Sequence, residues 1–168
     1  MRFYRRESKL TTIAVFVDVQ NMYYTCRDQF GTSLNYRNFF AFLQQRGDIV
    51  HAFAYAIERA DDKQRKFQDA LRHIGFTVKL KPFIQRSDGT SKGDWDVGIT
   101  IDMLEYASAV DEVILLSGDG DFAMLLSHIK QKFPTRCTVV GVDQLTAFAL
   151  RQSADEFLPI GRQWLQTS

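Results

Sequence analysis

Apolar residues recur in short runs along the chain, and each run has the length and composition of a β-strand. The runs cover residues 13–18, 49–57, 76–82, 112–117, 137–142 and 157–160. The first of them is continuously apolar and rich in β-branched and aromatic residues until it ends at Asp18. Continuous apolarity is typical of a strand that is covered on both faces. We therefore expect buried strands, with the last run at an edge of the sheet.

Between these runs, apolar residues return at the three- and four-residue intervals of an amphipathic helix. The clearest case is 61–74, where Phe67, Leu71 and Ile74 share one face, acidic residues occupy the first turn and Gly75 follows. Further helices are predicted at 35–45, 95–107, 122–129 and 145–151. The polar segment 84–93 contains Asp-Gly and Lys-Gly turn signals, so we expect a loop there.

This alternation of strands and helices predicts an α/β fold. The expected architecture is a mostly parallel sheet of about five to six strands with helices on both faces, which makes a three-layer sandwich. In such sheets, ligands bind beyond the carboxyl ends of the strands. Residues that directly follow a strand are therefore the first candidates for a site.

Length and composition suit a single domain. The chain has 168 residues, of which 45% are hydrophobic, enough for a sizeable core. Residues 1–10 are polar and basic and predict a flexible arm, followed by one domain over 11–168. The aromatic content of 13% leaves room for an apolar interface, so a homodimer stays open.

The sequence also bears on the compartment. It contains no run of about 18 apolar residues that could form a membrane helix, and the first residues do not resemble a signal peptide. Cys26 and Cys137 show no metal-ligand spacing and no pairing logic, which fits a reducing environment. We expect a cytoplasmic protein that does not bind membranes.

Charge is distributed unevenly along the chain. The net charge of +1 predicts no strong overall attraction to nucleic acid. However, residues 59–92 carry nine Lys/Arg against four Asp, whereas residues 93–121 carry eight Asp/Glu and no Lys/Arg. The acidic block includes a predicted helix and a very apolar strand, so some of its carboxylates must lie close to the interior.

Two predicted strands end in aspartate where this architecture places its sites. Asp18 ends the first strand, and Asp119 and Asp121 follow the strand 112–117. The glycines of the turn Ser117-Gly118-Asp119-Gly120-Asp121 permit close backbone approach and positive φ angles, so the two carboxylates can converge. Carboxylate oxygens suit Mg²⁺ or Mn²⁺. Adjacent carboxylates repel one another unless a cation neutralises them, which favours a metal site.

Helix capping is the competing interpretation of these residues. Asp121 could cap the helix that follows it, and Asp18 could cap a first helix containing Met22 and Tyr23. Capping alone does not explain why Asp18, Asp119 and Asp121 all stand at strand ends.

The helix predicted from Trp95 carries further aspartates, which its geometry separates. At 100° per residue, Asp96 projects near Thr100, whereas Asp102 lies about 120° away. Asp96 is therefore the preferred fourth ligand, and Asp94 is assigned as a cap. Asp102 is either structural or part of the site. Arg59 and Lys92, in the basic segment, could receive a phosphate backbone or simply face solvent.

Three segments together resemble a known family. They are Val15-Phe16-Val17-Asp18-Val19-Gln20-Asn21, then Lys92-Gly93-Asp94-Trp95-Asp96-Val97 followed by Ile101-Asp102-Met103-Leu104, and Leu116-Ser117-Gly118-Asp119-Gly120-Asp121-Phe122. In this order they resemble the NYN domain family, in its LabA-like bacterial branch, over residues 13–160. The family is similar to PIN-like nucleases, so the resemblance implies a PIN-like fold and an acidic ribonuclease-like site.

The resemblance implies particular roles for matched residues. Asp18, Asp96, Asp119 and Asp121 would be the catalytic, metal-binding carboxylates, with Asn21 beside the first of them, and Asp102 matches a recurring aspartate without an assigned role. In the ribonuclease hypothesis that follows, Asn21 and Ser117 or Thr100 would orient ligands or water. The hypothesis is a Mg²⁺- or Mn²⁺-dependent ribonuclease with RNA as its substrate.

Two alternatives remain at this level. The chain could be a non-catalytic regulatory or RNA-binding module that retains the acidic cleft, or a phosphatase acting on a small soluble phosphomonoester. Metal-dependent turnover of a polymer separates the ribonuclease from both.

Overall fold

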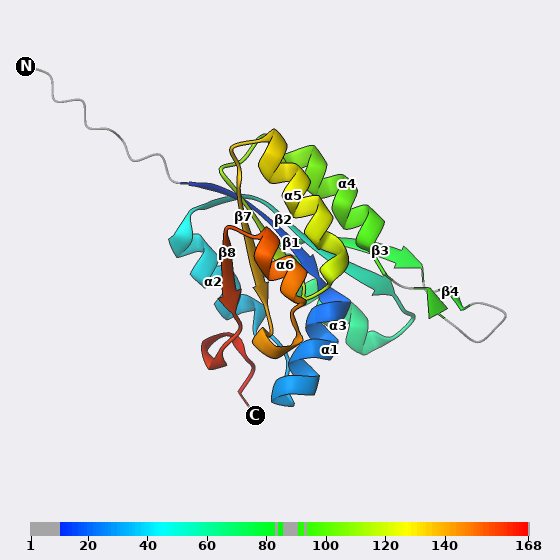
Figure 1. The fold of residues 1–168 in the computed structure, drawn as a ribbon. Coiled ribbons are helices and arrows are strands. Elements are labelled where there is room, and N and C mark those ends of the chain that lie inside the picture. The colour runs from blue at the N-terminus through cyan, green and yellow to red at the C-terminus, as the bar shows by residue number, and fades with distance from the viewer. Residues whose placement is uncertain (1–10, 83, 86–90, 93, 168) are drawn as a thin grey trace, which may run out of the picture.

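Six parallel strands form the central sheet in the order β3-β2-β1-β6-β7-β8 in this computed structural model, which describes residues 11–82, 84–85, 91–92 and 94–167 (Figure 1). The strands are β1 (Thr12–Asp18), β2 (Asp48–Glu58), β3 (Thr77–Pro82), β6 (Glu112–Leu116), β7 (Arg136–Gly141) and β8 (Glu156–Pro159). The α/β class with a parallel sheet is therefore confirmed. The predicted arm at residues 1–10 lies outside the described residues.

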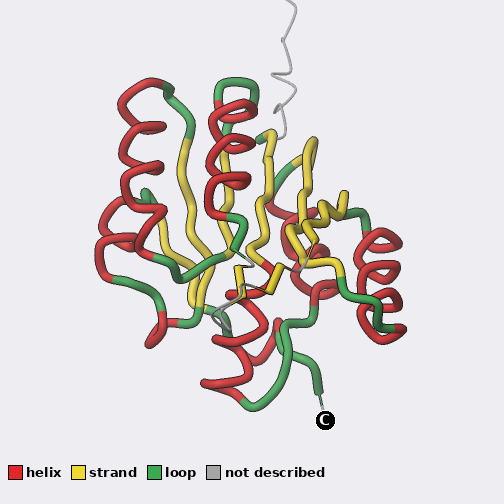
Figure 2. Tube along the Cα trace, turned by 90° about the vertical axis from the view of Figure 1, so that its right-hand side faces the viewer, coloured by secondary structure: helices red, strands yellow, loops and turns green. Residues whose placement is uncertain are grey.

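Helices cover both faces of the sheet (Figure 2). They are α1 (Val19–Phe30), α2 (Tyr36–Arg46), α3 (Asp62–Ile74), α4 (Asp96–Ala107), α5 (Ala123–Lys132) and α6 (Phe148–Ser153), with short 3₁₀ turns η1 (Gly120–Phe122), η2 (Asp143–Leu145) and η3 (Arg162–Trp164). In the part of the chain that the structure describes, none of the helices is long and apolar enough to cross a bilayer.

The alternation of side chains along β1 explains the two apolar layers. Val15 and Val17 pack into the cluster shared with α1, α2 and α3, whereas Ala14 and Phe16 pack into the cluster shared with α4, α5 and α6. Successive strand residues point to opposite faces, so a strand covered on both sides must be apolar throughout. This is the physical basis of the continuous apolar runs in the sequence.

The order of the strands reverses beside β1. The chain builds outward from β1 to β2 and β3, then returns to place β6 on the other side of β1 and continues to β7 and β8. Such a switch point leaves a crevice at the carboxyl ends of the two central strands, where open α/β sheets bind their ligands. Asp18 ends β1, and the turn with Asp119 and Asp121 follows β6, so the predicted acidic residues flank this crevice.

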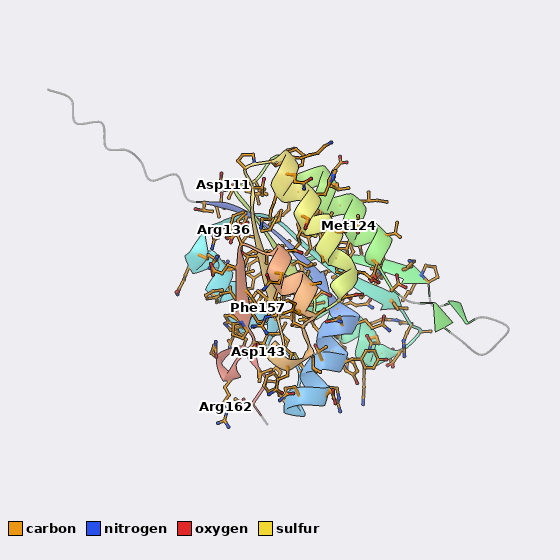
Figure 3. The ribbon with its side chains drawn as sticks, viewed as in Figure 1. Asp111, Met124, Arg136, Asp143, Phe157 and Arg162 are labelled. Carbon is orange, nitrogen blue, oxygen red and sulfur yellow. The ribbon has the colours of Figure 1, made fainter. Side chains whose placement is uncertain are left out.

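An ion-pair network closes the opposite, amino-terminal edge of the sheet. Arg46, at the end of α2, donates two hydrogen bonds to Glu112, at 2.9 and 2.8 Å, and also contacts Glu156. Glu112 is 2% exposed and is further approached by Arg136, which begins β7 near Asp111 (Figure 3). A buried carboxylate needs such partners because desolvation otherwise makes its charge costly.

Two local details differ from the sequence-based expectations. The segment predicted as a loop at 84–93 includes a short antiparallel pair, β4 (Ile84–Gln85) with β5 (Ser91–Lys92). The strands are only two residues long, so they leave no detectable periodicity. The helix predicted at 145–151 begins later, because residues 143–145 form the 3₁₀ turn η2 and α6 starts at Phe148. The helix considered after Asp18 is present as α1.

Candidate metal centre

Three carboxylates meet at the crevice between β1 and β6. Oxygen atoms of Asp96, Asp119 and Asp121 all lie within 4.8 Å of one another. Asp96 is the first residue of α4, and the other two belong to the turn between β6 and α5. Asp96 and Asp119 are half-buried, whereas Asp121 is exposed. The arrangement thus offers carboxylate oxygens from two separate segments to one point that solvent can reach.

The turn after β6 folds in this way for a steric reason. A Cβ atom at Gly118 would lie 2.5 Å from the carbonyl oxygen of Leu145, so only glycine allows this close approach. The expectation of positive φ angles in the turn is wrong, because in the described residues only Gly31 and Gly75 have them. Asp119 accepts a hydrogen bond from the backbone N–H of Asp121 at 2.9 Å, which begins the 3₁₀ turn η1.

Asp18 lies behind the three converging carboxylates. Its side chain is 9% exposed, and Oδ1 accepts a hydrogen bond from the N–H of Asn21 at 3.4 Å, so Asp18 does cap α1. Its Oδ2 accepts a hydrogen bond from the Ser117 hydroxyl at 3.1 Å, and the same Oγ accepts one from the N–H of Asp119. Capping and membership of the acidic cluster are therefore compatible in one residue.

Asn21, Ser117 and Thr100 hold the backbone around the carboxylates. The Asn21 Oδ1 accepts a hydrogen bond from the Gly118 N–H at 2.9 Å, which joins α1 to the turn after β6. Ser117 is fully buried and bridges the two strand ends. The Thr100 hydroxyl donates to the backbone carbonyl of Asp96 at 2.7 Å, one turn earlier in α4. These three side chains therefore hold the backbone segments that carry the carboxylates.

Burial and mutual repulsion raise the pKa of two of these acids. Burial is the main cause of the rise in the pKa of Asp18 to about 6, which the hydrogen bonds from Asn21 and Ser117 partly oppose. The pKa of Asp96 rises to about 7, first through burial and then through the neighbouring charge of Asp119. Carboxylates that lie this close together in a partly buried site are stabilised when they bind either a proton or a cation.

Asp102 lies in a separate cluster of contacts. Its Oδ2 accepts hydrogen bonds from the Tyr55 hydroxyl at 2.7 Å and from Lys79 Nζ at 2.6 Å. Tyr55 is 1% exposed, so Asp102 provides the partner that a buried phenol needs. It is not in the group of Asp96, Asp119 and Asp121. No pattern in the sequence indicated that Tyr55 and Lys79, on β2 and β3, would contact α4.

Three further predicted residues belong to segments before or between the elements of the site. Asp94 accepts a hydrogen bond from the N–H of Asp96 at 3.3 Å, but the N-cap position of α4 is occupied by Trp95, so the expected cap is wrong by one residue. Arg59 directly follows β2, at the carboxyl edge of the sheet. Lys92 belongs to β5, but its side chain lies outside what the structure describes.

The chain is similar to two other bacterial proteins over most of its length. The chain is 33% identical over 156 residues to "Low amplitude and bright protein LabA" of Synechococcus elongatus, across 88% of this chain and 83% of that protein. It is 48% identical to a crystal structure of a protein of unknown function from Vibrio parahaemolyticus, with a TM-score of 0.91 over 96% of this chain and 99% of the other.

A more distant structure shares only the general architecture. Ribokinase from Giardia lamblia superposes with a TM-score of 0.50 at 13% identity, covering 90% of this chain and 57% of the kinase. That level of identity shows a common fold and nothing about activity.

Most of the chain also matches a protein-family model. The model of the NYN domain matches residues 12–161, from the start of β1 to just beyond β8, and so includes all four aspartates around the crevice. The chain belongs to the NYN domain family, and its acidic crevice is the crevice of a nuclease-like domain of the LabA-like type.

Proposed function

We propose that this protein is a metal-dependent ribonuclease that hydrolyses phosphodiester bonds of RNA at Asp18, Asp96, Asp119 and Asp121. The observation that carries the proposal is the convergence of the last three carboxylates within 4.8 Å, at the switch point of a nuclease-like domain. Asp18 stands directly behind them and is joined to them through Ser117.

The donor set fits a hard divalent cation. The three converging groups are carboxylates, which Mg²⁺ and Mn²⁺ favour, and one of them is exposed enough for water or a phosphate to share the ion. Burial, and after it the charges of neighbouring aspartates, raises the pKa of Asp18 and of Asp96, and a bound cation would favour their ionised forms. Asp96, Asp119 and Asp121 would hold the ion directly, and Asp18 would complete the set from β1.

A bound Mg²⁺ or Mn²⁺ would supply Lewis-acid activation of water and of the scissile phosphate. The chain's own residues fix the geometry of the site. Ser117 and Asn21 join α1, β1 and the turn after β6, so the carboxylates cannot spread apart in response to their repulsion. Thr100 fixes the carbonyl of Asp96 at the start of α4. Rigid placement of this kind lowers the reorganisation that the reaction would otherwise require.

We assign two basic residues to the phosphates that flank the scissile bond. Arg59 follows β2 at the carboxyl edge of the sheet, and Lys92 precedes Asp96 by four residues. Contacts of this type are independent of sequence and weaken as salt increases. RNA is the proposed polymer because the chain belongs to the NYN domain family, whose similarity to PIN-like nucleases implies a ribonuclease-like site, and because Asp121 is exposed.

The direct test incubates the purified chain with labelled single-stranded RNA or DNA in Mn²⁺, Mg²⁺ or EDTA. The parent chain is expected to cleave RNA with either metal and not with EDTA, and Asp119→Asn to lower the rate by at least 100-fold. Asp28→Asn, at an exposed position of α1, is the matched control and should cleave like the parent.

Metal binding is measured separately by calorimetry with Mn²⁺ in the absence of RNA. Binding by the parent chain that Asp119→Asn abolishes would support the metal site whether or not cleavage is seen. Metal binding without turnover of any RNA would contradict the ribonuclease and favour the non-catalytic module. Turnover of a small phosphomonoester in preference to RNA would favour the phosphatase.

A further inference from the structure

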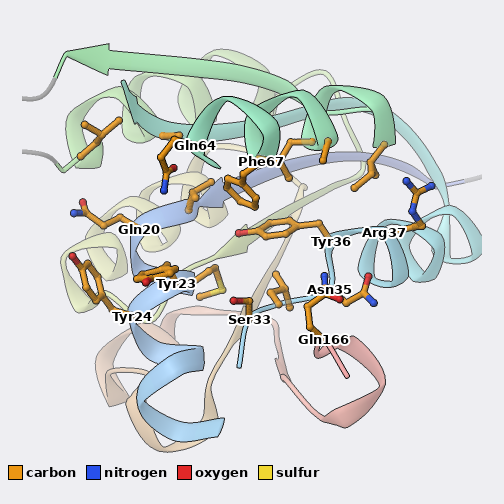
Figure 4. A pocket seen from close by; sticks show the side chains of 18 of the residues that line it. Gln20, Tyr23, Tyr24, Ser33, Asn35, Tyr36, Arg37, Gln64, Phe67 and Gln166 are labelled. Atoms are coloured by element: carbon orange, nitrogen blue, oxygen red, sulfur yellow. The ribbon is translucent and has the colours of Figure 1, made fainter. Parts of the chain in front are cut away.

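A deep groove lies next to the acidic crevice, on the face of the sheet that α1, α2 and α3 cover. It encloses about 790 Å³ between these helices and the end of β2 (Figure 4). This is within the range of about 300–1,000 Å³ that small-ligand pockets occupy. Val19 and Gln20, which line the groove, directly follow Asp18. The groove therefore begins where the carboxylate cluster ends.

The groove combines aromatic rings with side-chain amides. Tyr23 and Tyr24 are 48% and 57% exposed, and their rings meet edge to face at 5.3 Å. Side-chain amides are contributed by Gln20, Asn35, Gln64 and Gln166, and positive charge by Arg37 and Arg59. Flat rings and amides together suit a planar ligand whose edge carries hydrogen-bond donors and acceptors.

Tyr36 provides an independent sign of a polar ligand. The residue is 7% exposed, and its ring is packed edge-on against Phe67 at 5.7 Å and Phe76 at 6.0 Å. Within the described part of the chain the hydroxyl has no protein hydrogen-bond partner, and it is not one of the fully buried side-chain polar atoms, so it opens onto the groove. Figure 4 shows that hydroxyl reaching from α2 across the groove toward α1. Because this hydroxyl reaches the open space of the groove, it is placed to donate a hydrogen bond to an acceptor on a ligand bound there.

Burial keeps this phenol in its donor form, since it raises the pKa of Tyr36 above the ordinary tyrosine value. An aliphatic ligand would offer no hydrogen-bond partner to the Tyr36 hydroxyl or to the glutamine amides of the groove. A nucleobase satisfies them, because its ring can stack on tyrosine and its edge can pair with amide and hydroxyl groups. Arg37, exposed at the start of α2, can pair with the phosphate attached to that base.

We infer that this groove binds a nucleobase of the single-stranded RNA whose neighbouring phosphodiester lies at the acidic crevice. The inference rests on the proposed ribonuclease and adds base recognition to it. The Tyr36 hydroxyl donates to the base, and Tyr23 provides a stacking surface on α1. The same chemistry is presented by a free nucleotide, so the test must separate the strand from the monomer.

The experiment measures binding without cleavage. Fluorescence anisotropy of labelled single-stranded oligoribonucleotides, one for each base, is recorded in EDTA, with nucleoside monophosphates as competitors. One homopolymer is expected to bind more tightly than the others. Tyr36→Phe, which removes only the hydroxyl, should weaken binding of that homopolymer about three- to tenfold and reduce the preference between bases.

A second variant fills the groove. Ala70 is an exposed residue of α3 that lines it, and Ala70→Trp should weaken binding of every oligomer at least tenfold. Tyr106→Phe and Ala149→Trp are the matched controls, because these residues belong to α4 and α6 on the opposite face and should bind RNA like the parent. Circular dichroism checks that each variant is folded.

The outcomes separate this inference from the proposed function. Weaker RNA binding by Tyr36→Phe and Ala70→Trp supports base recognition even if the protein cleaves no RNA with any metal. Unchanged binding in both variants overturns it, even if Asp119→Asn abolishes cleavage. A parent chain that binds no oligomer overturns it too. Equal affinity for a monophosphate and for the oligomer would assign the groove to a free nucleotide and overturn the RNA strand as occupant.

Discussion

The Ser117 hydroxyl donates a hydrogen bond to Oδ2 of Asp18 at 3.1 Å, although the two residues are 99 positions apart in the chain. Ser117 is fully buried and Asp18 is 9% exposed, so this bond joins the ends of β1 and β6 beneath the acidic cluster. The same Oγ accepts the N–H of Asp119, which ties the turn of the proposed metal ligands to β1.

Ser117→Ala should therefore destabilise the protein by about 1–2 kcal/mol, because a nearly buried carboxylate and a backbone N–H both lose a partner. Urea unfolding measures the change. Ser108→Ala, at an exposed position after α4, is the control and should stay within about 0.5 kcal/mol of the parent. Equal stability of the two variants would show that the bond between strand ends contributes nothing.

Asp96→Asn should have opposite effects on the thermal stability of the metal-free protein and on its stabilisation by Mn²⁺. Without metal at pH 8, the variant is expected to unfold at the same or a higher temperature than the parent, because burial and the charge of Asp119 oppose the ionised form of Asp96. Saturating Mn²⁺ should raise the unfolding temperature of the parent and leave the variant unchanged. A Mn²⁺-induced rise of equal size in both proteins would remove Asp96 from the metal site.

Asp102 is expected to matter for stability and not for metal. Asp102→Ala removes the shared partner of Tyr55 and Lys79 and should cost about 2 kcal/mol, since the Tyr55 phenol is buried. Calorimetric Mn²⁺ affinity should equal that of the parent. A tenfold loss of Mn²⁺ affinity, with unfolding unchanged, would instead place Asp102 in the metal site.

Arg46 should be among the residues most sensitive to substitution. Arg46→Met leaves Glu112, which is 2% exposed, without its two-bond partner, and we expect a loss of about 3 kcal/mol in the free energy of unfolding. Arg65→Met tests the same substitution at a guanidinium that is 68% exposed and should change little. Comparable losses in both variants would contradict the network as the cause.

The stability of the amino-terminal edge of the sheet should depend on pH through Glu156. Its pKa is lowered chiefly by the hydrogen bond from Arg136, so the ionised form stabilises the fold. That stability is fully present above the unfolded-state pKa of about 4.3 and is lost as pH falls through the lower folded-state pKa. Glu156→Gln should thus be less stable than the parent by about 0.5–1 kcal/mol at pH 7, and the gap should close below about pH 4. A gap that persists at pH 3 would exclude ionisation as its source.

The local pattern of apolar and polar residues predicted most of the strands and helices of the fold. The continuous apolar runs predicted the parallel strands because covering both faces of a strand requires apolar residues at every position. The spacing of Phe67, Leu71 and Ile74 predicted α3, and Gly75 marks its end at φ 134°. Aspartates that directly follow strands predicted the crevice, because parallel strands bring their carboxyl ends to one edge.

The sequence alone determined the fold class, the approximate elements and the identity of the acidic residues, because these follow from periodicity and from the residues at strand ends. Only the tertiary structure decided which side chains meet. In the folded chain Asp96 lies with Asp119 and Asp121. Asp102 accepts hydrogen bonds from Tyr55 and Lys79. Tyr36 lines a groove. Each of these depends on the packing of helices against distant strands, and contacts between elements leave no periodic trace in either partner's sequence.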